Sequence, residues 1–172
     1  NKKVVFVGGN NSCSDKSVKK DRLWSTQLSD WNDWQDISTS CFSASFLQYP
    51  KLKSIGDLAP AVAALKPDVV VISAGATYKK LLINQDMSTS YPVLAELKKY
   101  RTLMPKATLI VVGAWSPTSD IPPLVKSLNT ALAQSTKSVS ALLVTPIDIN
   151  NILAKYSVYH NPALTGVGQT EL

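Results

Sequence analysis

The segment at residues 66–75, KPDVVVISAG, constrains the fold more than any other part of the chain. After Pro67 and Asp68 it runs through four consecutive β-branched apolar residues, Val69 to Ile72, and it leaves at Gly75. An unbroken apolar run of this kind is typical of a central strand in a parallel sheet, because helices cover both faces of such a strand. The rest of the chain must therefore supply helices for two faces.

The remaining sequence alternates between apolar runs and segments whose apolar residues have helical spacing. Further strands are predicted at residues 4–7 (VVFV), 36–40, 107–115 (ATLIVVGAW) and 141–146 (ALLVTP). Helices are predicted at residues 17–34, 57–65, 91–104 and 121–134, with a short one at 147–155 and a last one starting near Leu164. This alternation indicates an α/β domain with a parallel sheet and right-handed crossovers. No linker or repeat interrupts residues 1–172, so we expect a single domain.

Length and charge narrow the classes of function. The chain has 172 residues, enough for one sizeable core, and a net charge of +6. Basic and aromatic residues do not interleave as in a nucleic-acid module, so we expect no nucleic-acid partner. The charge supports at most a weak attraction to anionic polymers such as surface glycans. The chain starts at Asn1, so we expect it to be a piece of a longer chain. It has no apolar run that could span a bilayer, and a membrane-embedded region of that longer chain is a candidate partner.

The cysteines and the histidine indicate whether a metal site is expected and which redox compartment the protein occupies. Cys13 and Cys41 form no CxxC pair, and His160 is the one histidine. We therefore expect neither a metal nor a cofactor. Both cysteines follow predicted strands, so a disulfide, which requires an oxidising compartment, and two free thiols are equal alternatives.

The strand ends carry the candidate site, because ligands of open parallel sheets bind outside the carboxyl ends of the strands. Small and hydroxyl residues gather there, at positions 8–12, 40–43, 73–77, 113–116 and 145–148. Glycines let backbone N–H groups approach a ligand, and helix N-termini favour an anion or an oxyanion. Trp115, Tyr78 and Tyr159 lie near strand ends and are candidates for stacking on a sugar ring, with core packing as the alternative for each.

Four strings in sequence order resemble the SGNH (GDSL-type) hydrolases: VVFVGGNNS, KPDVVVISAGAT, the Leu128-Asn129 pair and SVYHNPALTGVG. The resemblance covers nearly the whole chain. It implies a flavodoxin-like three-layer α/β/α sandwich with a parallel five-stranded sheet. It also implies ester or acyl chemistry, in which a serine attacks, a histidine takes its proton, an aspartate orients the histidine, and a serine N–H, a glycine and an asparagine form the oxyanion hole.

The chain departs from the family pattern at most of its named positions. Asn10 stands where the nucleophilic serine is expected, and the next hydroxyl is Ser12. Thr77 replaces the oxyanion asparagine, and Ser157 replaces the orienting aspartate three residues before His160. Ser43 and Gly56 are the nearest matches to the second glycine block, and Asp148 is an alternative orienting group for the histidine. The resemblance implies catalytic roles for Ser12 and His160, and rim roles for Gly9, Asn10, Gly75 and Thr77.

Three functions remain open from the sequence. The first is an extracytoplasmic esterase or O-acyltransferase domain acting on acyl esters of a surface glycan, since SGNH domains of this size occur as soluble parts of membrane O-acyltransferases. The second is a non-catalytic SGNH-fold domain that binds a glycan, an acylated small molecule or a partner protein. The third is a nucleotide or phosphate binder with GGNNS as its anion loop, although the chain lacks GxGxxG and GxxxxGK patterns.

Overall fold

The computed structural model describes residues 1–8, 23–38, 42–46, 53–74, 92–115, 123–145, 159–160 and 163–164. Its strands are β1 (Lys2–Gly8), β2 (Trp34–Asp36), β3 (Phe42–Ser43), β4 (Val69–Ser73), β5 (Thr108–Val112), β6 (Leu142–Val144), β7 (Tyr159–His160) and β8 (Ala163–Leu164). Its helices are α1 (Trp24–Trp31), the 3-10 helix η3 (Gly56–Leu58), α2 (Ala59–Ala64), α4 (Val93–Leu103) and α5 (Pro123–Ser138).

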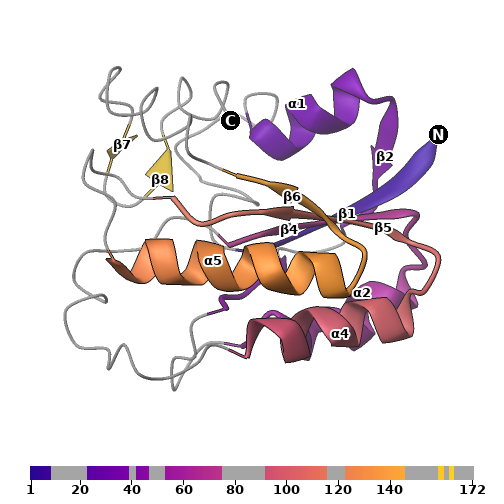
Figure 1. The fold of residues 1–172 in the computed structure, drawn as a ribbon. Helices are drawn as coiled ribbons and strands as arrows, with labels where there is room; N and C mark the ends of the chain where they lie inside the picture. The colour runs from indigo at the N-terminus through magenta and orange to yellow at the C-terminus, as the bar shows by residue number, and fades with distance from the viewer. Residues whose placement is uncertain are drawn as a thin grey trace.

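A parallel sheet with the order β2-β1-β4-β5-β6 forms the centre of the molecule (Figure 1). β3 also pairs with β1 in parallel. β4 takes one edge of β1, so β2 and β3 share the other edge, β2 beside Lys2 to Val4 and β3 beside Val7 and Gly8. The sheet thus has five strand positions in the order of flavodoxin-like folds, which confirms the predicted fold class.

The structure corrects part of the strand predicted at residues 36–40: β2 ends at Asp36, Ile37 and Ser38 are not in a strand, and residues 39–40 lie outside the described residues. Ile37 N–H still donates to Val4 O at 3.0 Å, but the next donor on β1, Phe6 N–H, bonds the Ser38 hydroxyl oxygen at 3.2 Å. Backbone pairing with β1 resumes in β3, where Phe42 is aligned with Val7, and it extends to Ala44, whose N–H donates to Gly8 O at 3.1 Å. A serine side chain therefore stands in for a backbone acceptor at the break.

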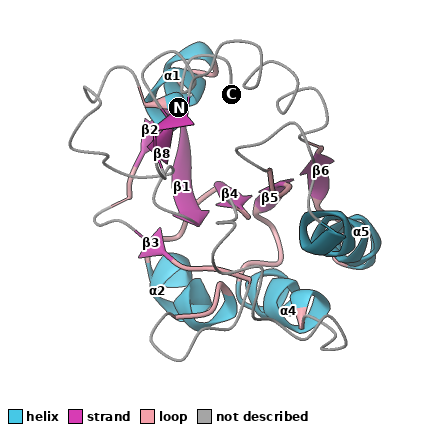
Figure 2. Cartoon of the chain, turned by 90° about the vertical axis from the view of Figure 1, so that its left-hand side faces the viewer, coloured by secondary structure: helices cyan, strands magenta, loops and turns pink. Residues whose placement is uncertain are grey.

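Helices cover both faces of the sheet, as Figure 2 shows with α1 on one side and α2, α4 and α5 on the other. On the α1 face, Trp24 meets Phe6 edge to face, with ring centroids 5.4 Å apart. Val69 to Ile72 of β4 are at most 1% exposed, with alternate side chains in the core clusters on either face. Burial on both faces is the property that the apolar run at residues 66–75 predicts for a central strand.

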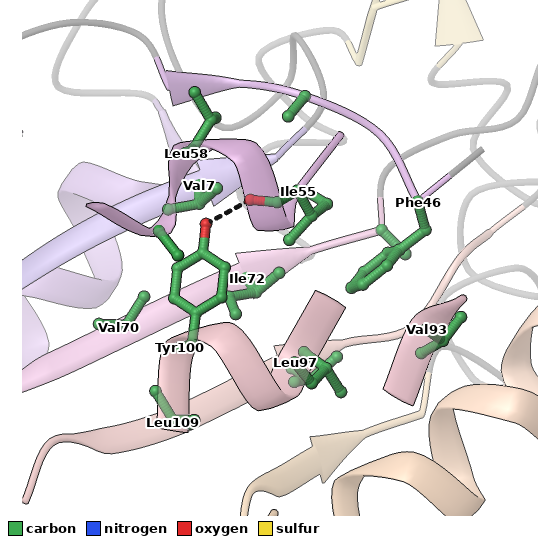
Figure 3. Close-up of a cluster of buried hydrophobic side chains, with 14 of the residues drawn as sticks. Val7, Phe46, Ile55, Leu58, Val70, Ile72, Val93, Leu97, Tyr100 and Leu109 are labelled. Atoms are coloured by element: carbon green, nitrogen blue, oxygen red, sulfur yellow. Dashed lines mark hydrogen bonds between the residues drawn. The ribbon is translucent and has the colours of Figure 1, made fainter. Parts of the chain in front are cut away.

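Tyr100 of α4 carries a polar group into the larger of these two cores (Figure 3). Its ring is fully buried, and its hydroxyl donates to Ile55 O at 2.8 Å. Burial, and then the nearby Glu96 carboxylate, raise the pKa of the Tyr100 phenol far above its ordinary value. The phenol therefore stays neutral and joins α4 to the residue before η3.

Arg101 joins α4 to the amino end of β5 and to the end of α5. Its Nε donates to Val139 O at 2.8 Å, and its Nη2 donates to Ser140 O at 3.1 Å. Its Nη1 lies within bonding distance of three carbonyl oxygens, those of Met104, Pro105 and Ala107. One guanidinium thus satisfies carbonyl groups at two chain turns, which suits its planar arrangement of donors.

The helices largely match their predicted positions. α1 ends at Trp31, before Asp33 adopts a φ of +53°, so the predicted 17–34 helix is shorter at this end; residues 17–22 lie outside the described residues. α5 continues to Ser138, beyond the predicted end at residue 134. The helix predicted at 147–155 also lies outside the described residues. The last helix was predicted to start near Leu164, and this start is wrong, because Leu164 pairs with Tyr159 in an antiparallel β7–β8 ladder and its backbone is extended.

Candidate functional site at the carboxyl edge of the sheet

One row of residues crosses the sheet at the carboxyl ends of its strands. The strand register aligns Gly8 with Ser73, Ser73 with Val112, and Val112 with Val144. On the other side of β1, Gly8 is aligned with Ser43. We call these five residues the rim row: Ser43, Gly8, Ser73, Val112 and Val144. The segments predicted to carry the site, including residues 9–12 and 75–77, follow directly from the rim row.

The chain order reverses between β1 and β4, so Gly8 and Ser73 lie at the topological switch point. Open α/β sheets bind their ligands at this point. Gly8 has a φ of +144°, and a β-carbon built on it would lie 2.2 Å from Ser73 O. Ser73 is itself 1% exposed. The two strand ends thus pack backbone against backbone at the place where a ligand is expected.

Asn129 of α5 holds the chain just beyond the end of β5. Its Oδ1 accepts from Ala114 N–H at 2.8 Å, and its Nδ2 donates to Ala114 O at 2.9 Å. The preceding residue, Gly113, still bonds the sheet through its N–H to Val144 O at 2.9 Å. A single side-chain amide therefore satisfies both backbone groups of Ala114. Sequence reasoning placed Asn129 within the resemblance but assigned it no contact.

Trp115 follows Ala114 and is fully buried, with 0% of its surface exposed. A ring without exposed surface offers no face to a sugar. Of the two roles expected for Trp115, sugar stacking and core packing, the structure supports core packing.

The two residues nearest to the family's second glycine block differ in their surroundings. Ser43 lies in the rim row beside Gly8. Gly56 opens η3, and its N–H donates to the buried Glu96 carboxylate. Because that N–H is already bonded, Gly56 is a structural residue, and only Ser43 lies beside the switch point.

Ser54 and Asp57 brace the start of η3 by a reciprocal pair of hydrogen bonds. Asp57 N–H donates to Ser54 Oγ, and Ser54 N–H donates to Asp57 Oδ2, each at 3.2 Å. The bonds from Ser54, and more weakly the charge of Lys99 at 3.8 Å, hold the pKa of the Asp57 carboxyl below its ordinary value. This arrangement is that of a capping box, so these charges stabilise a helix start and are not part of the rim row.

Of the predicted catalytic pair, only His160 lies in a described element. It belongs to β7, aligned with Ala163 of β8, and its neighbour Tyr159 is aligned with Leu164. Figure 1 draws β7 and β8 on the side of the sheet toward which the parallel strands run. The other predicted site residues and the two cysteines lie outside the described residues: Gly9, Asn10, Ser12, Cys13, Cys41, Gly75, Thr77, Tyr78, Asp148 and Ser157. Their roles stay predictions.

Two further observations concern the described residues alone. They contain no group of three His, Cys, Asp or Glu side chains that could hold a metal ion. None of the helices among them has the length and hydropathy of a membrane span.

No protein-family model and no curated protein sequence matches this chain. Solved structures do match it over nearly its whole length. The psychrotrophic esterase EstA from Pseudoalteromonas sp. is 18% identical with a TM-score of 0.62, and the alignment covers 99% of this chain and 91% of the esterase. A protein of the lipolytic G-D-S-L family from Desulfitobacterium hafniense is 14% identical with a TM-score of 0.60, and both chains are covered completely.

This chain has the SGNH hydrolase fold. An acetylxylan esterase from Geobacillus stearothermophilus is similar as well, at 14% identity and a TM-score of 0.64, with 99% of this chain and 90% of the esterase covered. The likeness at these identities establishes the fold, and it confirms the resemblance that the four sequence strings suggested. The resemblance places the nucleophile in the segment after β1. The rim row contains the last residue of β1, so it directly precedes that segment in the sequence.

Proposed function

We propose that this chain is an SGNH-type esterase or O-acyltransferase domain that acts on acyl esters of a surface glycan. The observation that carries the proposal is that β1 ends at the switch point, with Gly8 against Ser73. Ser12 follows Gly8 by four positions in the sequence, so the chain enters the ligand-binding edge just before this hydroxyl. Several proteins of the same fold are esterases.

In the proposed reaction, Ser12 Oγ attacks the carbonyl carbon of the ester while the imidazole of His160 takes the hydroxyl proton. The carbonyl oxygen becomes an oxyanion, stabilised by rim donors from Gly9, Asn10, Gly75 and Thr77. Collapse of this intermediate breaks the bond to the alcohol, which leaves with the proton from His160. Water or a glycan hydroxyl then attacks the acyl-serine, and Ser12 is regenerated.

The net charge of the chain and the substrates of structurally similar proteins support the proposal that the substrate is a glycan. The net charge of +6 favours an anionic polymer. Neighbours of the same fold include the acetylxylan esterase and a family 3 carbohydrate esterase from Clostridium thermocellum. An extracytoplasmic location, with the membrane-embedded part of a longer parent chain as partner, belongs to the same proposal.

Hydrolysis of p-nitrophenyl acetate by the purified chain tests the enzymatic proposal. We expect measurable turnover that Ser12→Ala and His160→Ala each abolish, because loss of the nucleophile or the base removes most of the rate. Ser14→Ala is the matched control, two positions beyond Ser12 in the same segment, and it should keep the wild-type rate. Turnover that survives both Ser12→Ala and His160→Ala contradicts the assignment.

A second candidate is a non-catalytic SGNH-fold domain that binds the glycan. It is favoured by the replacements at Asn10, Thr77 and Ser157, since an amide cannot attack a carbonyl and a serine cannot hold an imidazolium as a carboxylate does. Thermal unfolding with acetylated and deacetylated xylo-oligosaccharides separates the candidates. A rise in Tm without turnover supports the binding domain, and an unchanged Tm without turnover contradicts both candidates.

A further inference from the structure

The strands of the parallel sheet begin at the edge opposite the rim row, which we call the amino edge. Figure 1 draws the start of β1 and the ends of α1, α4 and α5 there, on the side of the sheet away from β7 and β8. An exposed lysine lies at or just before the start of β1, β4, β5 and β6. We call these residues the edge lysines: Lys2, Lys3, Lys66, Lys106 and Lys137.

The edge lysines keep their positive charge uncompensated by direct contacts within the described part of the chain. The ion pairs there are those of Lys99 with Asp57 and Glu96, and they include no edge lysine. A row of exposed ammonium groups on turns at one edge, rather than spread over helix faces, produces a local positive potential. The amino edge therefore attracts an anionic partner.

Aspartates at the same edge weaken this potential without cancelling it. They are fewer than the edge lysines, namely Asp30, Asp33 and Asp68. The Asp33 carboxylate accepts from the side-chain amide of Asn1 at 2.9 Å, and the Asp68 carboxylate accepts from Lys3 N–H at 2.8 Å. These donors hold the two carboxylates within the protein surface, and the positive charge remains in excess.

Large apolar side chains are exposed at the same edge. Trp31, the last residue of α1, is 72% exposed, and Leu103, the last residue of α4, is 48% exposed. The two helices cover opposite faces of the sheet, as Figure 2 shows, so the apolar side chains lie on either side of the edge lysines. Tryptophan is enriched where a membrane meets water, because its ring is amphipathic. The surface thus combines basic and apolar groups.

We propose that the amino edge is a docking surface for an anionic lipid bilayer. The edge lysines contact the headgroups, while Trp31 and Leu103 enter the boundary between headgroups and acyl chains. An anionic polymer would suit the lysines but would offer no apolar phase to Leu103. This docking turns the rim row away from the bilayer. It does not depend on the proposed esterase function, since binding to vesicles requires no turnover.

Co-sedimentation of the purified chain with lipid vesicles tests the proposal. Vesicles of phosphatidylcholine mixed with phosphatidylglycerol should bind the chain, and vesicles of phosphatidylcholine alone should bind it much more weakly. Added salt should release it, because salt screens exposed charges. Brominated lipid should quench the emission of Trp31, which is readily distinguished from Trp24 and Trp115 by Trp31→Phe, since those two side chains are buried.

α5 offers a matched pair of lysine substitutions, because Lys137 lies at the amino edge and Lys126 is exposed at the other end of the same helix. Lys137→Gln should weaken vesicle binding about fivefold, the contribution of one lysine near an anionic surface. Lys126→Gln should bind almost as the wild type does. The two positions are about 16 Å apart along the helix, beyond the Debye length of about 8 Å at physiological salt.

The apolar side chains have a matched control as well. Trp31→Ser should weaken vesicle binding about tenfold, and Leu103→Ser should weaken it severalfold, because each removes apolar surface from the interface. Val144→Ser is the control, since Val144 is 46% exposed but lies in the rim row at the opposite edge. Its binding should equal that of the wild type.

Absence of binding to the mixed vesicles overturns the proposal, as do equal effects within either matched pair. Dextran sulfate identifies the alternative partner. If the chain binds dextran sulfate through Lys137 and binds the mixed vesicles no better after Trp31 is restored in Trp31→Ser, the amino edge is a site for an anionic polymer and the bilayer proposal is wrong.

Discussion

A β-carbon placed on Gly8 would lie 2.2 Å from the carbonyl oxygen of Ser73 and 3.0 Å from its carbonyl carbon. The obstacle is the backbone of the adjacent, buried strand end, so it cannot swing aside as a flexible side chain would. The φ of +144° at Gly8 is also strained for any residue with a side chain. The two strand ends at the switch point therefore approach this closely only because residue 8 is glycine.

Gly8→Ala should accordingly destabilise the fold by about 3 kcal/mol, through steric overlap and backbone strain together. Denaturant unfolding measures the change. Lys2→Ala, at the exposed start of the same strand, is the control and should shift stability by less than about 0.5 kcal/mol. A loss below about 1 kcal/mol for Gly8→Ala would show that the strands can separate at this point.

Ser38 should contribute more to stability than an ordinary half-exposed serine. Its hydroxyl oxygen accepts from Phe6 N–H at the break between β2 and β3, and Ser38→Ala leaves this donor without that partner. We expect a loss of about 1–2 kcal/mol in equilibrium unfolding. Ser138→Ala is the control, because the hydroxyl of Ser138 bonds only its own exposed helix turn, at Gln134 O. Equal, near-zero effects of the two substitutions would contradict the bridging role.

Arg101→Lys should destabilise the protein by about 2 kcal/mol, although the charge is conserved. A lysine ammonium concentrates its donors at one point and cannot reach the carbonyl groups of Val139, Ser140 and Ala107 together. Lys98→Arg, an exchange in the opposite direction at an exposed site on the same helix, should be neutral. If Arg101→Lys also leaves the midpoint of urea unfolding unchanged, the multiple bonds do not contribute to stability.

Tyr100→Phe should lower the free energy of unfolding by about 1–2 kcal/mol near neutral pH, because Ile55 O loses its donor in the core.

The Tyr100 phenol also makes the free energy of unfolding depend on pH, with a defined sign. Burial raises the pKa of the Tyr100 phenol, so the folded state holds its proton where the unfolded state, with a pKa near 10, releases it. Stability contributed by this proton is complete below about pH 10 and is lost as pH rises further.

Unfolding free energies at pH 9 and above test this sign. The wild type should lose more stability with rising pH than Tyr100→Phe, which lacks the phenol proton. The absorbance of tyrosinate gives an independent check, because folded wild type and folded Tyr100→Phe should release the same number of phenol protons. An extra titrating tyrosine in the folded wild type would show that Tyr100 is accessible to hydroxide.

The sequence predicts the sheet best where burial leaves a clear signal. Val69 to Ile72 of β4 and Val4 to Val7 of β1 are unbroken apolar runs because both faces are covered, and the strands predicted there are present in the structure. β2 and β3 form an edge position, and β2 has only half-buried and exposed residues. At the break between them the Ser38 hydroxyl substitutes for a backbone acceptor, and the periodicity of the sequence gives no sign of such a substitution.

The candidate site is harder to predict, because its contacts join residues that are distant in sequence and because the sequence departs from the pattern that it resembles. The Asn129–Ala114 pair joins residues 15 positions apart on a helix and a strand end. The one sequence signal that could have indicated this contact is Asn129 itself, a polar residue within the apolar pattern of a helix. The general rule for open parallel sheets predicts the edge where the site is expected. The resemblance implies roles for Ser12 and His160, and these stay predictions, because Asn10 stands where the resemblance places the nucleophilic serine.

The central pairing of β1 with β4 also bears on how this protein folds. Lys3 N–H donates to the Asp68 carboxylate at 2.8 Å across 65 residues of chain, and the rest of the pair continues in the same register. Among the pairs of the described parallel sheet, this one closes the longest loop, so the slow step should involve the β1–β4 pair. Substitutions there should act mainly on the refolding rate, whereas substitutions at the outer strand β6 should act mainly on the unfolding rate. A domain of this topology would then remain exposed to aggregation and proteolysis until residues on both sides of that loop have been synthesised.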